Sequence, residues 1–159
     1  IAPDWWRKQI MYLPQEPYFM NGSIRENFNA FNPDLTAQEI RNFLVEVGLE
    51  ALADESPGGL DQPAGKGGVN FSLGVRRRLA LARALSHGGP LAILDEPTEG
   101  IDNIGASYVY KVMNDMAANG KTIIACSHDR EIIRGAHLFL DLNERPQPII
   151  KDINKNDLL

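Results

Sequence analysis

The residues best suited to chemistry are two adjacent carboxylates, Asp95 and Glu96, which directly follow the apolar run 91–94 (LAIL). Such a run is typical of a buried strand, and open α/β folds bind ligands where their parallel strands end. Because successive side chains point in different directions there, one carboxylate can hold Mg²⁺ while the other faces a water molecule. A polar stop before a turn at Pro97 would also explain the pair without any chemistry.

Two further polar side chains follow other predicted strands. Gln15 comes shortly after the apolar run 10–13 (IMYL), and His128 comes shortly after the run 122–125 (TIIA). If the three strands lie in one sheet, these side chains share an edge with the carboxylates. A lone histidine after a strand is more often structural than catalytic, and its expected place beside Glu96 is what favours a catalytic role.

The spacing of apolar residues predicts the elements that position these groups. Two capping boxes, at 23–26 and 36–39, predict helices that begin at residues 24 and 37. Further helices are expected at the ranges 73–86, about 101–118 and about 129–134, and a last strand at 138–140. The second half therefore alternates strand and helix, which predicts a parallel sheet, and the helical stretch 23–86 is an insertion beside it.

Composition and charge narrow the function classes. The 159 residues are 43% hydrophobic and 23% charged, as in a globular domain, and the net charge is −5. That charge argues against a general binder of nucleic acid or anionic membranes, although the basic run 76–78 could be interpreted as a nucleic-acid patch. The single cysteine, Cys126, excludes an intrachain disulfide and favours a reducing compartment.

The motifs, in their order, resemble the nucleotide-binding domain of an ATP-binding cassette (ABC) transporter from its glutamine loop to its C-terminus. The gap from Gln15 to Asp95 is 80 residues, and that from Asp95 to His128 is 33. The matching segments are the glutamine loop at 12–17 (YLPQEP), an exporter-like stretch at 22–27 (GSIREN), the signature motif at 71–75 (FSLGV), Walker B at 91–96, the D-loop at 99–102 (EGID) and the histidine switch at 127–129 (SHD).

The resemblance implies an ATPase that uses ATP and Mg²⁺. Asp95 would bind Mg²⁺, and Gln15 would reach the metal or its water and report nucleotide state to the membrane domain. Glu96 would act as general base on the attacking water, and His128 would contact the γ-phosphate. These roles suit phosphoryl transfer, which depends on positioning and charge neutralisation.

The resemblance also implies partners. Ser72 and Gly74 would present a hydroxyl and backbone N–H groups to ATP held by a second nucleotide-binding domain, and Asp102 would work at that dimer interface. A transmembrane domain would be the other partner, which places the domain at the cytoplasmic face of the cell (inner) membrane. Nucleic acid is not an expected partner.

The fold implied is α/β: a partial RecA-like P-loop NTPase core with a mostly parallel sheet and an inserted α-helical subdomain. Residues 1–22 would form the first core strand and the glutamine loop, and 23–88 the helical subdomain with the signature motif. Residues 89–143 would form the core with Walker B, D-loop and histidine switch, and 144–159 a C-terminal tail.

The phosphate cradle G-x-x-x-x-G-K-[ST] is absent from the sequence. The nearest imitation, Gly65-Lys66-Gly67, lacks the first glycine and the final hydroxyl, and matches instead the exporter loop before the signature, where Lys66 replaces the usual glutamate. We therefore expect the chain to be a piece of a longer protein, with its cradle upstream of Ile1, and to be inactive by itself.

Other positions depart from the family pattern. Leu73 and Val75 replace the Gly and Gln of the common signature Leu-Ser-Gly-Gly-Gln, and Glu99-Gly100 replaces the commoner Ser-Ala of the D-loop. We expect working but altered engagement of ATP, because Ser72 keeps its hydroxyl and backbone donors do not depend on side chains. These departures suggest the branch that exports proteins by type I secretion.

Two other functions fit the same motifs. One is a soluble ABC ATPase that acts on DNA or ribosomes, which would have coiled-coil arms or tandem cassettes and no membrane spans upstream. The other is a degenerate, non-catalytic cassette that only regulates or docks. The presence of Glu96 favours a working enzyme over this last alternative.

Overall fold

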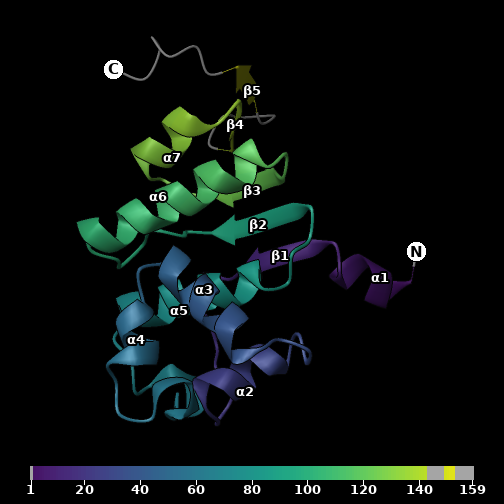
Figure 1. Cartoon of the computed structure of the whole chain (residues 1–159). Helices are drawn as coiled ribbons and strands as arrows, with labels where there is room; N and C mark the ends of the chain where they lie inside the picture. Colours follow the sequence, from purple (N-terminus) through teal and green to yellow (C-terminus); the bar gives the residue numbers. More distant parts are fainter. Residues whose placement is uncertain (1, 143–148, 153–159) are drawn as a thin grey trace.

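The computed structural model describes residues 2–142 and 149–152. Its centre is a three-stranded parallel sheet in the order β1 (Ile10–Leu13), β2 (Leu91–Asp95), β3 (Thr122–Cys126). Figure 1 shows the three strands side by side, with the helices α2 to α5 on one side and α7 on the other. The predicted α/β class with a parallel sheet is confirmed.

Helices cover one face of this sheet. α5 (Leu73–Leu85) packs against β1, and α6 (Asn103–Ala118) packs against β3. Side chains alternate along each strand, so Met11 and Leu94 are buried beneath the helices. On the opposite face, Tyr12 and Ile124 are 56% and 51% exposed. The described sheet is thus covered on one face only.

The inserted helical subdomain follows the sequence signals closely. It contains α2 (Ile24–Asn29), α3 (Ala37–Glu46), α4 (Glu50–Asp54) and two 3₁₀ turns, Gly59–Asp61 and Lys66–Gly68. Both predicted capping boxes form, at Ser23 and at Thr36. The short helices α1 (Pro3–Arg7) and α4 were not predicted, because neither is long enough to show a helical apolar period.

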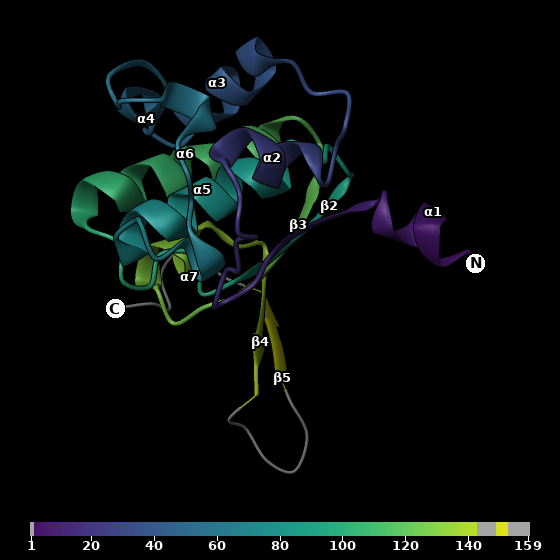
Figure 2. The same ribbon diagram turned by 90° about the horizontal axis from the view of Figure 1, so that it is seen from below.

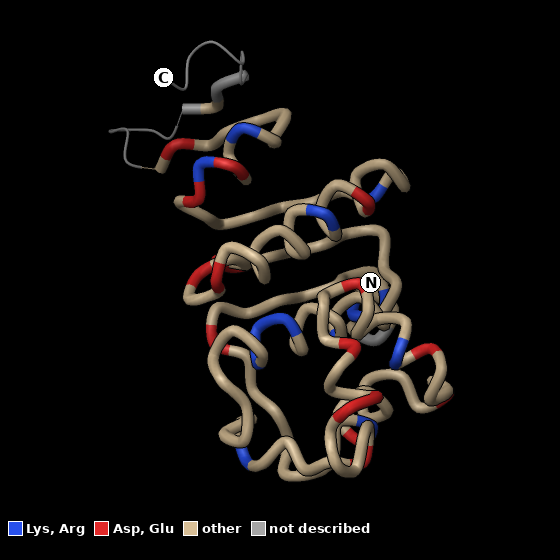
Figure 3. The backbone as a smooth tube through the Cα atoms, turned by 60° about the vertical axis from the view of Figure 1, so that its left-hand side comes forward, with Lys and Arg blue, Asp and Glu red and all other residues tan. Residues whose placement is uncertain are grey.

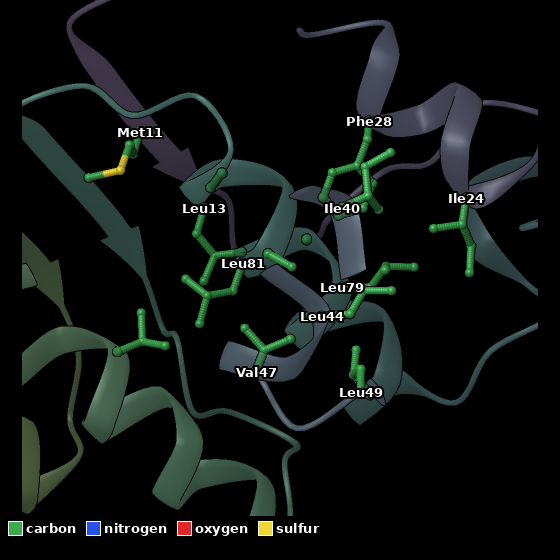
Figure 4. Packing of buried hydrophobic residues seen from close by; sticks show 14 of the residues in the cluster. Met11, Leu13, Ile24, Phe28, Ile40, Leu44, Val47, Leu49, Leu79 and Leu81 are labelled. Carbon is green, nitrogen blue, oxygen red and sulfur yellow. The ribbon is translucent and has the colours of Figure 1, made fainter. Parts of the chain in front are cut away.

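One hydrophobic core joins the subdomain to the sheet. The buried face of α3, Ile40 and Leu44, has no exposed surface, as the apolar spacing predicted. Figure 4 shows these side chains grouped with Leu79 and Leu81 of α5 and with Leu13 of β1. Because α5 contributes to both parts, the start of this helix is fixed relative to the ends of the strands.

The last predicted strand does not join the parallel sheet. β4 (Leu138–Asp141) pairs antiparallel with β5 (Ile149–Asp152), and Figure 2 shows this hairpin projecting away from the helices. The link from β3 to β4, residues 127–137 with the short helix α7 (Arg130–Gly135), is shorter than the dozen or so residues that a parallel crossover requires. The expected irregular tail at 144–159 therefore contains a strand; 144–148 and 153–159 lie outside the described residues.

Within the described residues, no helix combines the length and the apolar character that crossing a membrane would require.

Candidate functional site

The carboxyl ends of the three strands meet at one edge, as predicted. Leu13 lies opposite Leu94, and Asp95 lies opposite Cys126. The segments that leave this edge carry Gln15, the pair Asp95 and Glu96, and His128. Polar side chains from three segments that are far apart in sequence are therefore delivered to one edge of the sheet.

Glu96 and His128 are in direct contact. Nδ1 of His128 lies 2.8 Å from Oε1 of Glu96, and the hydroxyl of Ser127 donates to Oε2 at 3.3 Å. The Glu96 side chain is 19% exposed, whereas that of His128 is 81% exposed. Both carboxylate oxygens of Glu96 are therefore held from the β3 side, and the imidazole still presents Nε2 outward.

The backbone of Glu96 has an unusual conformation. Its φ of 45° is the one left-handed value among the described non-glycine residues. A left-handed non-glycine residue persists only when its surroundings hold it, and such residues gather at functional sites. Here the Glu96 N–H donates to the carbonyl of Cys126 at 2.8 Å, and the Glu96 carbonyl accepts from Nη1 of Arg77 at 3.1 Å.

Asp129 anchors the segment that carries His128. Its Oδ2 accepts from the Thr98 hydroxyl at 2.6 Å and from the Tyr110 hydroxyl at 2.7 Å, and its Oδ1 caps α7 at the N–H of Glu131. Burial opposes ionisation of Asp129, but these hydrogen bonds outweigh it and lower its pKa. The same bond to Asp129 raises the pKa of Tyr110 to about 12, so its phenol stays a donor at neutral pH.

Gln15 reaches the turn after β2. Its Nε2 donates to Oε2 of Glu99 at 3.2 Å, and the same carboxylate oxygen accepts from Nη2 of Arg77 at 2.9 Å. The hydrogen bonds from Arg77 and from Gln15 lower the pKa of Glu99. Gln15 therefore contacts the D-loop segment rather than Asp95.

The predicted phosphate-binding residues lie at the start of α5. Ser72 caps this helix, its Oγ accepting from the N–H of Val75 at 3.4 Å. Gly74 lies beside the turn after β2, and a Cβ on it would be 3.7 Å from the Gly100 carbonyl. Asp102 caps α6 through a 2.7 Å bond from the N–H of Gly105 to its Oδ1. Both segments lie against each other, and Asp102 has a structural task that the sequence did not reveal.

A family model described as "ABC transporter" matches residues 2–99, which is more than half of the chain. The chain belongs to the ABC transporter family. The match covers four of the six segments on which the resemblance rested: the glutamine loop, the exporter-like stretch 22–27, the signature motif and Walker B.

Curated ABC proteins are similar over most of this chain. The glutathione/L-cysteine transport system ATP-binding/permease protein CydC of Escherichia coli is 36% identical over 77% of the chain, which is 21% of CydC. The ATP-dependent lipid A-core flippase of Neisseria meningitidis is 32% identical over 91% of the chain and 23% of the flippase. Human ATP-binding cassette sub-family C member 4 is 31% identical over 96% of the chain and 12% of that protein.

The fold is also that of a solved ABC structure. A bacterial Atm1-family ABC exporter with ATP bound matches with a TM-score of 0.77 and 23% identity, covering 84% of this chain and 23% of the exporter. The partial ABC ATPase fold predicted from the sequence is thus confirmed. The chain spans about a fifth of the length of CydC and of the flippase.

Two departures from the common ABC motifs compensate each other. A Cβ on Gly100 would lie 2.7 Å from Cδ2 of Leu73, and Gly100 has a φ of 66°, which a side chain disfavours. The larger Leu73 of the signature motif therefore occupies space that the glycine of the D-loop leaves free. Leu73 remains 43% exposed, so it covers the start of α5 only in part.

The basic run of the ABC signature helix is used inside the molecule. Arg77 bonds Glu96 and Glu99, while Nη1 of Arg78 donates to the carbonyls of Val47 and Gly48 at 3.1 and 2.9 Å and so closes the end of α3. Figure 3 shows Lys and Arg positions spread among Asp and Glu positions over the chain. The third arginine of the run, Arg76, also points inward, and its Nη1 donates to the Gly67 carbonyl at 3.5 Å.

Sequence reasoning missed Arg77, Glu99, Thr98 and Tyr110 as members of this site. The signals were present but weak: Arg77 stood within a run of three arginines, and Glu99 was noted only as a departure from the usual D-loop. Nothing in the spacing of these residues indicated which partners they would meet.

The Glu96–His128 pair predicts a measurable titration. The hydrogen bond that Glu96 accepts from the ring raises the pKa of His128 above its usual 6.5. A raised pKa means that the pair stabilises the fold below the ordinary pKa, and that this contribution is lost as pH rises through the raised value. NMR titration of the His128 ring should show a midpoint above pH 6.5 in the wild type and a midpoint closer to 6.5 in Glu96→Gln. The same midpoint in both proteins would contradict the contact.

Proposed function

We propose that this chain is the ATP-hydrolysing domain of an ABC exporter, in which hydrolysis drives transport across the membrane. The observation that carries the proposal is the meeting of Gln15, Asp95, Glu96 and His128 at the carboxyl edge of the sheet. Family membership supports it, because the family match covers Gln15, Asp95 and Glu96.

The chain's own residues would work mainly by positioning. Glu96, held at both oxygens by Ser127 and His128, is placed to accept the proton of an attacking water. Because a carboxylate only accepts, Nδ1 of His128 donates to Glu96, and Nε2 can also donate to a phosphate oxygen when the ring is protonated, the form that its raised pKa favours. Asp129 keeps the histidine segment in place through Thr98 and Tyr110.

Asp95 and Gln15 fit the chemistry of a magnesium site completed by a nucleotide. Asp95 offers a carboxylate and Gln15 an amide oxygen, at the ends of neighbouring strands. No cluster of three or more His, Cys, Asp or Glu is placed to hold a metal within residues 2–142 and 149–152. Mg²⁺ commonly takes one or two protein oxygens together with substrate phosphates. When bound, the ion would neutralise charge on those phosphates.

Ser72 and Gly74 would serve a second nucleotide-binding domain, because the start of α5 offers a hydroxyl and backbone N–H groups to an anion. We also propose that the chain works with a transmembrane domain, at the cytoplasmic face of the membrane. Relatives named as an ATP-binding/permease protein and as a flippase favour it over a soluble ABC ATPase that acts on DNA or ribosomes. Export by type I secretion stays a prediction. The names of these two relatives do not refer to it: one name refers to glutathione/L-cysteine transport and the other to lipid A-core.

The chain by itself should not hydrolyse ATP, because it has no G-x-x-x-x-G-K-[ST] loop to grip the phosphates. Phosphate release should stay at background for the 159 residues and should rise in the full-length protein when Mg²⁺ is added. The control is the full-length protein in EDTA. Turnover by the isolated chain that disappears in Glu96→Gln would contradict the expectation, and Mg²⁺-independent or absent turnover in the full-length protein would contradict the proposed function.

A further inference from the structure

One guanidinium, that of Arg77 in α5, connects two loops of the site to this helix. Its side chain is 9% exposed, its Nη1 donates to the Glu96 carbonyl at 3.1 Å, and its Nη2 donates to Oε2 of Glu99 at 2.9 Å. The same oxygen of Glu99 accepts from Nε2 of Gln15 at 3.2 Å. The loops that follow β1 and β2 are therefore both tied to the signature helix.

The bond to the Glu96 carbonyl acts on a residue whose conformation needs support. A φ of 45° is not one that glutamate adopts without restraint. The direction of the peptide that Arg77 holds also sets the direction of the Glu96 side chain. A guanidinium suits this task because two of its N–H groups project in a fixed fork, whereas an ammonium is a point charge.

The bond to Glu99 orients a second side chain. An ionised carboxylate can only accept hydrogen bonds, so Glu99 binds the NH₂ end of the Gln15 amide and leaves the amide oxygen free. That oxygen is the atom with which a glutamine can bind a cation. Glu99 is ionised at neutral pH, and the hydrogen bond from Arg77 lowers the pKa of this carboxyl group further below its ordinary value.

We propose that Arg77 and Glu99 form a positioning unit, the Arg77–Glu99 clamp, which sets the direction of the Glu96 carboxylate and of the Gln15 amide together. Through this clamp, any movement of α5 that follows contact at Ser72 and Gly74 would reach both loops. The inference rests on the proposed function. The clamp gives Glu99 of the D-loop a role as the partner of the buried Arg77. Glu99 does not itself bind phosphate.

Arg77→Lys tests the clamp, because it keeps the charge and removes the fork. In NMR spectra of this chain, we expect the Glu96 amide and the Gln15 side-chain amide to shift. In the full-length protein, kcat for ATP hydrolysis should fall about 10- to 100-fold while KM for ATP changes less than about twofold. The matched control is Arg134→Lys, which alters an exposed pair with Glu131 at 2.8 Å and should change neither readout.

Glu99→Gln is the second variant. If circular dichroism shows that Arg77→Lys does not fold, Glu99→Gln becomes the test of the clamp. We expect the Gln15 side-chain amide to shift and kcat to fall about tenfold. Unmoved resonances with a kcat within twofold of wild type would overturn the clamp. If the wild-type full-length protein shows no ATPase activity, the proposed function fails separately, and the NMR shifts alone then support or overturn the clamp.

Discussion

Replacing Glu96 by Gln in the full-length protein should lower kcat for ATP hydrolysis about 1000-fold while ATP still binds. Glutamine has nearly the same shape, so the contacts with Ser127 and His128 can largely persist. It cannot take the proton of the attacking water, and a positioned general base contributes about 10²- to 10⁴-fold. Steady-state phosphate release and binding of a fluorescent ATP analogue would measure the two effects.

The control for this variant is Glu131→Gln. Glu131 is an exposed carboxylate paired with Arg134 on α7, at the same side of the sheet, and its side chain does not touch Glu96. We expect its kcat to stay within about twofold of wild type, as for most surface changes. A Glu96→Gln protein that hydrolyses ATP at the wild-type rate would rule out Glu96 as the base.

Gly89→Ala should lower the free energy of unfolding of this chain by about 3 kcal/mol, the upper part of the range for overpacked sites. A Cβ on Gly89 would lie 2.4 Å from the Gln9 carbonyl oxygen and 2.9 Å from the N of Ile10. These are backbone atoms at the start of β1, so they cannot rotate away as a side chain could. The strand would have to move relative to β2, which begins at Leu91 and is bonded to Gln9.

Urea denaturation followed by circular dichroism would measure this loss, with Gly135→Ala as the control. A Cβ on Gly135, the last residue of α7, has nothing within 4 Å, so the change should be neutral or slightly stabilising. Equal midpoints for Gly89→Ala and wild type would show that β1 and β2 do not approach as closely as described.

Local signals in the sequence predicted the elements that depend on local chemistry. Both capping boxes, at Ser23 and Thr36, began helices where expected, because the cap and its glutamate are three residues apart. The edge that joins Asp95 to His128 also followed, since parallel strands bring their carboxyl ends together. These inferences required only strand direction and the position of polar residues after each strand.

Contacts between distant segments could not be predicted in the same way. Arg77 meets Glu99 across 22 positions and Leu73 lies against Gly100, but a sequence does not say which surfaces of a helix and a loop will face each other. The pairing of β4 with β5 was missed for a related reason. The segment before Ile149 is polar, so no apolar pattern indicated the short strand that follows it. Leu73 and Gly100, two departures from the family motifs, therefore lie against each other in the structure.

We propose that ATP is hydrolysed at the carboxyl edge of β1, β2 and β3. The most direct test is a structure of the full-length protein with Mg²⁺ and a non-hydrolysable ATP analogue. We expect the γ-phosphate at this edge, with Mg²⁺ beside Asp95, His128 within hydrogen-bond distance of the phosphate, and Glu96 facing the water in line with it. An analogue bound elsewhere on the chain, with Glu96 and His128 still away from any phosphate, would contradict the account.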